Sequence, residues 1–285
     1  MLENDNLLDI SQRNFSIKFD KNTGRFYDYT YKRNVLIEQG PELSLFRPLT
    51  DNDFGAALNR KVDYLKDPGM QLKNFSHYKT TSGGYEIVSE YKLLDGDASF
   101  VQTITIHDNG VLQVKNNFEV VEANHSMILK FGNSLTLPKS LNTFRWYGRG
   151  PWENYDDRKA SAMVGIYEGS VKEQYHPYVR PQESGNKTDV RWAQISNGKS
   201  VGFRINYVDD LLNVSVLPYS QEQLYPASEK GQEHSRLLEE DKVNHLNVDL
   251  KQMGVAGINS WGSLPLEEYL GCPLKITPIP TLFLR

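Results

Sequence analysis

Apolar and polar residues alternate in short segments along most of this 285-residue chain. The segments 15–19 (FSIKF) and 99–107 (SFVQTITIH) alternate cleanly, which is the pattern of a β-strand with one buried face. Between two such segments, Asp108-Asn109-Gly110 predicts a tight hairpin turn, because Asn and Gly accept positive φ angles. The pattern predicts strands at 15–19, 25–35, 85–93, 99–107, 111–121, 126–137, 143–147, 201–207, 211–217 and 245–250.

Helical periodicity is nearly absent. Residues 62–74 are expected to hold one short helix or an irregular excursion, and the polar segment 221–241 a loop with at most a short helix. Prolines interrupt the pattern near the C-terminus and predict an irregular tail there. Many short alternating segments with few helices are typical of an all-β fold, a large antiparallel β-sandwich. We therefore expect a single domain at 15–285, preceded by an N-terminal tail at 1–14.

Charge and composition narrow the classes of partner. The net charge is −4 with both signs spread along the chain, which argues against nucleic acid or an anionic membrane as the main partner. The single Cys272 excludes an internal disulfide. No apolar run approaches the ~20 residues of a membrane helix, and the first ten residues lack the features of a signal peptide. We expect no binding to nucleic acid or membranes, and a location in the cytoplasm, or in the periplasm if the chain was excised from a secreted parent.

The segment 148–192 holds the densest run of unusual residues. It combines Trp152, Tyr155, Tyr178 and Trp192 with several Arg and acidic side chains, and no helical period fits it. Long ordered loops in compact domains are uncommon and are often functional. The alternative interpretation is a well-packed loop between sheets, anchored by its aromatic side chains.

The acidic side chains of this segment are candidates for glycoside hydrolysis, which needs two carboxylates about 5 to 10 Å apart across the scissile bond. Four Arg residues lie among them, however, and Arg–carboxylate pairs that fix a loop are the commoner outcome. A structural role is therefore favoured over catalysis. The acidic residues are Glu153, Asp156, Asp157, Glu183 and Asp189, and the Arg residues are Arg149, Arg158, Arg180 and Arg191.

The sequence lacks the motifs for nucleotide binding, metal binding and nucleophilic catalysis. Gly148-Arg149-Gly150 continues with Pro151 and without a strand-then-helix context, so it is not a dinucleotide-binding motif. The six His residues show no zinc-binding spacing. The acidic segment 51–53 lacks the spacing of a calcium loop and is expected to cap its own turn. No nucleophile motif occurs. We expect no cofactor or metal in this chain.

Four motifs, in this order, resemble the C-terminal domain of β-galactosidases of glycoside hydrolase family 2. They are LTDNDFG at 49–55, GRGPWENY at 148–155, YVRPQESG at 178–185 and NSWG at 259–262. In some bacteria this domain is a separate chain, the small subunit of a two-chain β-galactosidase. The resemblance covers roughly residue 15 to the end, and four motifs in the family's order are far more specific than any one of them.

The resemblance implies a fold and a division of labour. The family's C-terminal domain is a large antiparallel β-sandwich, a supersandwich, with a galactose-mutarotase-like topology. The family's two catalytic glutamates lie in a (β/α)₈ barrel, and Glu153 and Glu183 do not match them. A barrel-bearing large chain or domain would therefore supply both glutamates and any Mg²⁺ or Na⁺. The complete enzyme would hydrolyse terminal β-D-galactosides such as lactose, and the isolated chain would be inactive.

The resemblance implies that Trp261 binds substrate, together with the adjacent Asn259 and Ser260. In the family, this Trp reaches into the active site of the barrel, where an indole face can cover the C–H face of a sugar. The sequence departs from the family at 256–258, where Ala-Gly-Ile replaces the usual Gly-Gly-Asp. The other motif residues are expected to anchor loops or to lie at the interface with the barrel: Asp51, Asn52, Asp53, Trp152, Glu153, Asn154, Tyr155, Arg180 and Glu183.

Two further hypotheses stay open. A free-standing carbohydrate-binding or mutarotase-like protein would need a general acid and base near the sugar's anomeric oxygen, and His176 with Glu183 is the pair to test. A purely structural assembly module would not contact a ligand at all.

Overall fold

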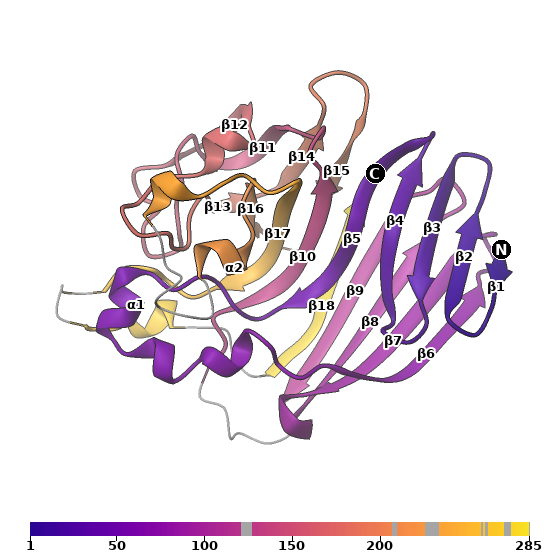
Figure 1. The fold of residues 1–285 in the computed structure, drawn as a ribbon, viewed down its shortest axis with the longest axis horizontal. Coiled ribbons are helices and arrows are strands. Elements are labelled where there is room, and N and C mark those ends of the chain that lie inside the picture. Colours follow the sequence, from indigo (N-terminus) through magenta and orange to yellow (C-terminus); the bar gives the residue numbers. More distant parts are fainter. Residues whose placement is uncertain are drawn as a thin grey trace.

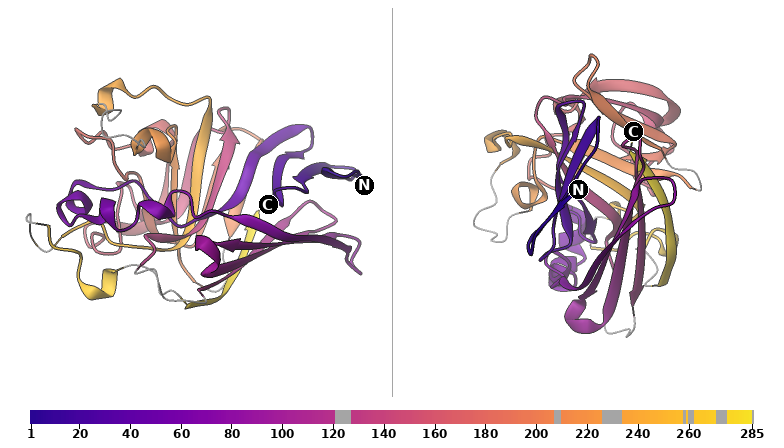
Figure 2. Two further views of the ribbon diagram at one scale, coloured as in Figure 1. Left: turned by 60° about the horizontal axis from the view of Figure 1, so that its bottom comes forward. Right: turned by 90° about the vertical axis from the view of Figure 1, so that its right-hand side faces the viewer.

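The computed structural model describes residues 1–120, 127–206, 210–225, 234–257, 259 and 262–270, together with the backbone of 275–284. Its strands form two antiparallel sheets of nine strands each, and Figures 1 and 2 show the two sheets packed face to face. The all-β sandwich expected from the alternation is therefore confirmed.

The first sheet has the strand order β1-β2-β3-β4-β5-β10-β17-β16-β13. Its first five strands follow chain order because short turns join them, and the other four come from later in the sequence. The strands are β1 (Leu2–Glu3), β2 (Leu7–Ser11), β3 (Phe15–Asp20), β4 (Arg25–Tyr31), β5 (Asn34–Ser44), β10 (Lys130–Pro138), β17 (Val243–Gln252), β16 (Leu212–Leu217) and β13 (Lys187–Val190).

The second sheet has the order β12-β11-β14-β15-β18-β9-β8-β7-β6. The predicted turn at 108–110 joins two of its neighbours, since Ile106 of β8 pairs with Leu112 of β9. The strands are β6 (Gln71–Lys79), β7 (Tyr85–Leu93), β8 (Ala98–Ile106), β9 (Leu112–Val120), β11 (Thr143–Gly150), β12 (Met163–Ser170), β14 (Trp192–Ser196), β15 (Gly202–Asn206) and β18 (Lys275–Leu284).

The core lies between the sheets because each strand buries alternate side chains. Along β8, every second residue from Ala98 to Ile106 is buried, and the residues that alternate with them are partly exposed on the outer face. Loops and short helices pack on the outer faces of the sheets, and pockets form there.

The helices are short. Figures 1 and 2 show α1 at the end of the molecule opposite the N-terminal hairpins. The helix expected within 62–74 is a single 3₁₀ turn, and the segment 221–241 begins with α2. The helices are α1 (Asp51–Gly55), α2 (Gln221–Leu224), and the 3₁₀ turns η1 (Leu58–Arg60), η2 (Asp63–Leu65), η3 (Leu94–Gly96), η4 (Lys172–Gln174), η6 (Ser235–Leu237) and η7 (Glu267–Tyr269). No helix in the described part of the chain has the length and apolar character to cross a membrane.

Two segments expected to be irregular contain strands. Residues 2–11, expected as a tail, form β1 and β2, and Leu8 and Ile10 are fully buried because their side chains continue the core. The segment 148–192 contains β12 and β13. Strand β12 gives no alternating pattern because it is an edge strand, with Met163, Val164 and Ile166 all exposed.

The C-terminal segment is also a strand rather than an irregular tail. Strand β18 pairs with β9 on one side and β15 on the other. Its pairing register shifts between Ile276 and Ile279 and again between Ile279 and Leu282, where Pro278 and Pro280 lie. A proline cannot donate to the ladder, so irregular pairing at these positions accommodates it.

Candidate functional site

The first motif forms α1, which a buried ion pair holds in place. The Thr50 side chain caps the helix by accepting from the Asp53 N–H, and the Asp53 carboxylate accepts from the Thr50 N–H at 2.8 Å. The same carboxylate lies 2.6 Å from Arg47 Nη1, and the two side chains are 0% and 3% exposed. Asp53 is thus fully engaged in capping and ion pairing, in line with the capping role expected from the sequence.

Asp51 joins this motif to the third one. Arg180 Nε donates to Asp51 Oδ1 at 2.7 Å, and the Asp51 N–H donates to the Gln182 side-chain oxygen at 3.1 Å. The Arg180 guanidinium also lies over the Phe54 ring, with 3.9 Å between its central carbon and the ring centroid. The loops 51–55 and 178–185 therefore form one unit.

Glu153 of the second motif is held by three donors. They are the Tyr178 hydroxyl, Arg158 Nη2 at 2.5 Å and the Gly185 N–H at 2.8 Å. Burial by itself would raise the pKa of Glu153, but these hydrogen bonds outweigh it and lower the pKa below its ordinary value. Such a carboxylate stays ionised and is poorly suited to protonate a leaving group.

The neighbours of Glu153 have contrasting environments. Asn154 is fully buried, and its side-chain oxygen accepts from the Thr188 N–H at 2.8 Å and from the Thr188 hydroxyl at 2.6 Å. Trp152 exposes 56% of its surface. Asn154 therefore fixes the loop from inside, whereas Trp152 presents an indole at the surface of this chain.

Glu183 of the third motif is a buried carboxyl group whose pKa lies near neutral pH. The Tyr155 hydroxyl lies 3.4 Å from Glu183 Oε1. Burial raises the pKa of Glu183 to about 7, although the nearby Lys130 and Arg47 pull it down. A carboxyl group in this range changes its charge around neutral pH, which is frequent at functional sites but also occurs in structural networks.

The backbone that leads to the fourth motif is held at three successive residues. The three partners come from different parts of the chain, and together they restrain this segment. Gly254 is required here, because a Cβ at this position would collide with the Asp157 carboxylate. The three hydrogen bonds run from Arg47 Nη2 to the Gly254 carbonyl (3.0 Å), from Asn52 Nδ2 to the Val255 carbonyl (3.1 Å) and from the Ala256 N–H to Asp157 Oδ2 (2.8 Å).

Gly262 fixes the other end of this segment against α1. Its φ is +90°, and a Cβ on it would collide with the Gly55 carbonyl oxygen, so only glycine fits. Ile258, Ser260 and Trp261 lie outside the described residues, and Asn259 is exposed. The structure thus shows how both ends of the segment that carries Trp261 are anchored.

The first three motifs and the backbone that leads to the fourth meet at one pocket of about 250 Å³, which we call the motif pocket. Among the residues selected from the sequence, Asp51, Asn52, Tyr155 and Glu183 line it. Asp53, Glu153, Asn154 and Arg180 support it through the hydrogen bonds described above. The lining residues are Thr50, Asp51, Asn52, Tyr155, Arg158, Tyr178, Gln182, Glu183, Val255 and Ala256.

Arg47 helps to hold this site together but was not predicted from the sequence, and Asp157 was named only among the acidic residues of the segment 148–192. Arg47 stands in the otherwise apolar run 45–49, a signal for a buried, paired charge. Asp157 had no distinguishing signal among its acidic neighbours. Lys187 was missed as well: it is 1% exposed, burial lowers its pKa to about 8, and its Nζ donates to the Gly185 carbonyl at 3.1 Å.

His176 and Glu183 do not form a hydrogen-bonded pair among the described residues. The His176 ring packs edge-on against Tyr178, with centroids 4.4 Å apart. In the described part of the chain, no group of three or more His, Cys, Asp or Glu side chains could hold a metal ion.

Comparison with known proteins identifies the family. The family model described as β-galactosidase small chain matches residues 11–277. The chain belongs to this family. Similar curated proteins carry the name β-galactosidase: the Priestia megaterium protein is 35% identical over 268 residues, and the Lactobacillus delbrueckii subsp. bulgaricus protein is 34% identical over 279 residues. A Vibrio cholerae β-galactosidase is 36% identical over 277 residues.

The small-chain match covers only part of these relatives. The aligned region takes in 94% of this chain but 25% of the Priestia protein and 26% of the Lactobacillus protein. The chain therefore spans about a quarter of the length of the curated relatives it matches.

A solved structure supports the fold alone. The α-galactosidase AgaB of Geobacillus stearothermophilus, from glycoside hydrolase family 36, aligns with 98% of this chain and 39% of its own, with a TM-score of 0.50 and 7% identity. At this identity the likeness concerns the arrangement of strands and carries nothing about activity.

Proposed function

We propose that this chain is the C-terminal domain or the separate small subunit of a β-galactosidase of glycoside hydrolase family 2. Membership in the small-chain family and coverage of a quarter of β-galactosidase relatives support this assignment. The complete enzyme would hydrolyse terminal β-D-galactosides such as lactose with retention of configuration. The cytoplasm is the compartment we infer for it.

In this proposal the barrel-bearing partner supplies both catalytic glutamates and any Mg²⁺ or Na⁺. Glu153 is an unsuitable acid, because three hydrogen bonds stabilise its ionised form. A glycosidase needs one carboxyl group that stays protonated until it protonates the leaving group, together with a second carboxylate across the bond. Asp51 also lines the motif pocket but is paired with Arg180, so Asp51 and Glu183 do not make such a pair.

The observation that carries the proposal is the anchoring of the segment that bears Trp261. Arg47, Asn52 and Asp157 hold the backbone before it, and Gly262 packs against Gly55 after it. Holding a loop at both ends reduces the entropy that it loses when it binds. We infer that Trp261, with Asn259 and Ser260, forms an apolar platform under the sugar in the partner's active site.

The exposed residues next to the motif pocket would form the contact with the barrel. Trp152 is 56% exposed and Val179 is 76% exposed, and both belong to or adjoin the motifs. Aromatic side chains such as that of Trp152 are enriched at protein interfaces. Their burial in the complete enzyme would order the rim of the motif pocket.

Hydrolysis of a chromogenic β-galactoside tests this assignment. The purified chain is assayed alone and after mixing with a barrel-bearing family 2 chain that lacks this domain. We expect no hydrolysis by the chain alone and hydrolysis on mixing. Clear activity of the chain alone would overturn the division of labour and would place catalytic carboxylates here, with Glu153 and Glu183 as the first to substitute.

The role of Trp261 has its own test in the assembled enzyme. Trp261→Ala should lower kcat/KM by an amount worth about 1–3 kcal/mol, the scale of a lost buried aromatic contact. Trp192→Ala, which removes an indole from the outer face of the second sheet, is the control and should leave kcat/KM close to the parent value. Normal activity of the Trp261 variant would remove the platform from the proposal.

A further inference from the structure

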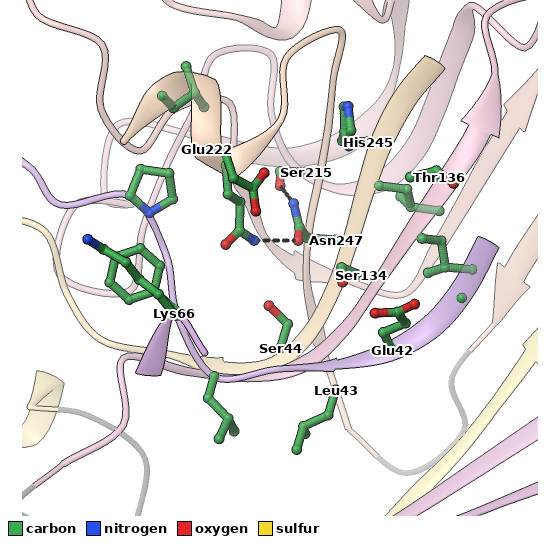
Figure 3. A pocket seen from close by; sticks show the side chains of 18 of the residues that line it. Glu42, Leu43, Ser44, Lys66, Ser134, Thr136, Ser215, Glu222, His245 and Asn247 are labelled. Carbon is green, nitrogen blue, oxygen red and sulfur yellow. Dashed lines mark hydrogen bonds between the residues drawn. The ribbon is translucent and has the colours of Figure 1, made fainter. Parts of the chain in front are cut away.

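The outer face of the first sheet forms the floor of another pocket, of about 390 Å³ (Figure 3). We call it the sheet pocket. Its volume falls in the range of roughly 300–1,000 Å³ that is usual for small-molecule sites. The floor side chains come from four neighbouring strands: Glu42 and Ser44 of β5, Ser134 and Thr136 of β10, His245 and Asn247 of β17, and Ser215 of β16. Helix α2 and the segment 65–70 form its walls.

Asn247 is held in one orientation in the floor. Its side-chain oxygen accepts from the buried Lys130 Nζ at 2.9 Å and from Gln221 Nε2 at 3.1 Å. Its Nδ2 donates to Ser215 Oγ at 3.3 Å, which Figure 3 marks with a dashed line. The amide has a second N–H, and the Ser215 hydroxyl keeps its own proton, so both can still donate to a ligand.

Three hydroxyl groups of the floor keep their full hydrogen-bonding capacity. No hydrogen bond joins the side chain of Ser44, Ser134 or Thr136 to another described residue of the chain. Each hydroxyl can donate one hydrogen bond and accept two. Neighbouring strands lie about 4.8 Å apart, so side chains from adjacent strands of the floor can contact one small polyhydroxylated ligand together.

The basic side chains around the pocket are paired with carboxylates, and the lining also includes Asp67, Glu183 and Glu222, so the pocket is acidic. Arg25 Nη1 lies 3.3 Å from Glu42 Oε2, His245 Nε2 lies 2.9 Å from Asp241 Oδ2, and Lys66 is paired with Asp63 at 2.5 Å. An anionic ligand such as a phosphate would find no unpaired cation among these groups. Recognition here would rely on hydrogen bonds and on the apolar surface that Phe46 and Tyr219 add to the lining.

We propose that the sheet pocket binds a neutral saccharide. The donors and acceptors of Ser44, Ser134, Thr136 and Asn247 would pair with its hydroxyl groups, and the aromatic residues of the lining would cover its C–H surface. This site opens on the outer face of the first sheet and involves none of Asn259, Ser260 or Trp261. It gives the chain a second way to contact carbohydrate, independent of the proposed function.

Binding of D-galactose, D-glucose and lactose to the whole purified chain tests the proposal, by calorimetry and ligand-observed NMR. The double variant Ser134→Ala/Thr136→Val removes two floor hydroxyls with little change in volume. Its control is Ser99→Ala/Thr103→Val, which makes the same two chemical changes on the outer face of β8. We expect at least one of the three sugars to bind the parent and the control, and the floor variant to bind it about tenfold more weakly.

Three results would overturn the proposal: no sugar binds the parent at millimolar concentration, the floor variant binds as well as the control, or Trp261→Ala abolishes binding while the floor variant keeps it. The last result would place the sugar at Trp261, so it would support the proposed function while removing the sheet pocket. Ser44→Ala, on the adjacent strand, provides the same measurement if the double variant does not fold.

Discussion

Glu183 lines both the motif pocket and the sheet pocket, but the polar side chains of the two sites differ in their hydrogen bonding. Around the motif pocket, the supporting side chains of Asp53, Glu153 and Asn154 each accept hydrogen bonds from two or more donors. In the sheet pocket, the hydroxyls of Ser44, Ser134 and Thr136 have no such bonds to the described part of the chain.

This contrast separates residues that build a site from residues that can contact a ligand. A carboxylate that already accepts several hydrogen bonds is a poor partner for a ligand, because binding would first have to break those bonds. The conspicuous charged residues of the motifs therefore act as supports for the segment that carries Trp261. Small neutral side chains on an open sheet face keep their hydrogen-bonding capacity. No sequence motif marks them.

Removing Arg47 should give the largest effect on the motif pocket. Arg47→Met leaves the buried Asp53 carboxylate without its cation and frees the Gly254 carbonyl, so the free energy of unfolding should fall by about 3–5 kcal/mol. Urea denaturation at pH 7 measures this change.

The control for Arg47 is Arg145→Met, which removes an exposed pair. Arg145 Nε lies 3.8 Å from Glu168, and the two side chains are 49% and 59% exposed, so the loss should stay under about 1 kcal/mol. Equal losses in the two variants would mean that the buried pair does not support the motif pocket.

Gly262→Ala should disturb the anchored segment with the next largest effect. The change combines a φ of +90° with a collision against the Gly55 carbonyl, and we expect a loss of about 2–4 kcal/mol in unfolding free energy. In the assembled enzyme it should also lower β-galactoside hydrolysis, because the Trp261 segment shifts.

Gly83→Ala separates the two causes. Gly83 has a φ of +86° but nothing within 4 Å of an added Cβ, so only the backbone cost of about 1 kcal/mol remains. If both glycine variants lose the same stability, then the contact between Gly262 and Gly55 is not a constraint.

The two motif glutamates should respond to neutralisation with opposite signs. The pKa of Glu183 is raised to about 7, above its unfolded value, so its contribution to stability is fully present below about pH 4 and is lost as the pH rises through 7. Glu183→Gln cannot ionise, and it should be more stable than the parent at pH 8 by up to roughly 3 kcal/mol and nearly equal to it at pH 4.

Glu153 provides the opposite case, because its folded-state pKa is lowered. Its contribution is present above the unfolded pKa and is lost as the pH falls through the folded value. Glu153→Gln should therefore cost about 1–2 kcal/mol at pH 7, with the difference shrinking in acid. Urea denaturation at pH 4, 7 and 8 measures both variants, and a destabilised Glu183→Gln at pH 8 would show that its carboxylate is well satisfied.

Local patterns predicted much of the fold. Strict alternation identified β3 and β8, and the 108–110 turn between β8 and β9 followed from backbone preferences alone. Strand β18 was missed because its prolines conceal a pattern that becomes regular only through shifted pairing with β9. The strands within residues 2–11 were not predicted, because they pair along a sheet edge that other strands create.

The candidate site was predictable only in part, for a related reason. The motifs identified the loops, but the bonds that join them cross long stretches of chain, as in the contact of Arg47 with Gly254, 207 residues away. No local period encodes such a pairing. The sheet pocket left no motif, because Ser134 and Thr136 resemble the outward-facing residues of any half-buried strand.

The smallest expected effect provides the most direct comparison of the two pockets. Thr188→Val and Thr136→Val remove the same hydroxyl group from two strands of the first sheet. Thr188 is fully buried and donates to Asn154 at 2.6 Å, so its loss should cost about 1–2 kcal/mol in unfolding free energy. Thr136 has no such bond to the described chain, so its loss should stay within about 0.5 kcal/mol. Equal costs in urea denaturation would mean that the Thr136 hydroxyl is already used within the protein, and the sheet pocket would then lose a donor that the saccharide requires.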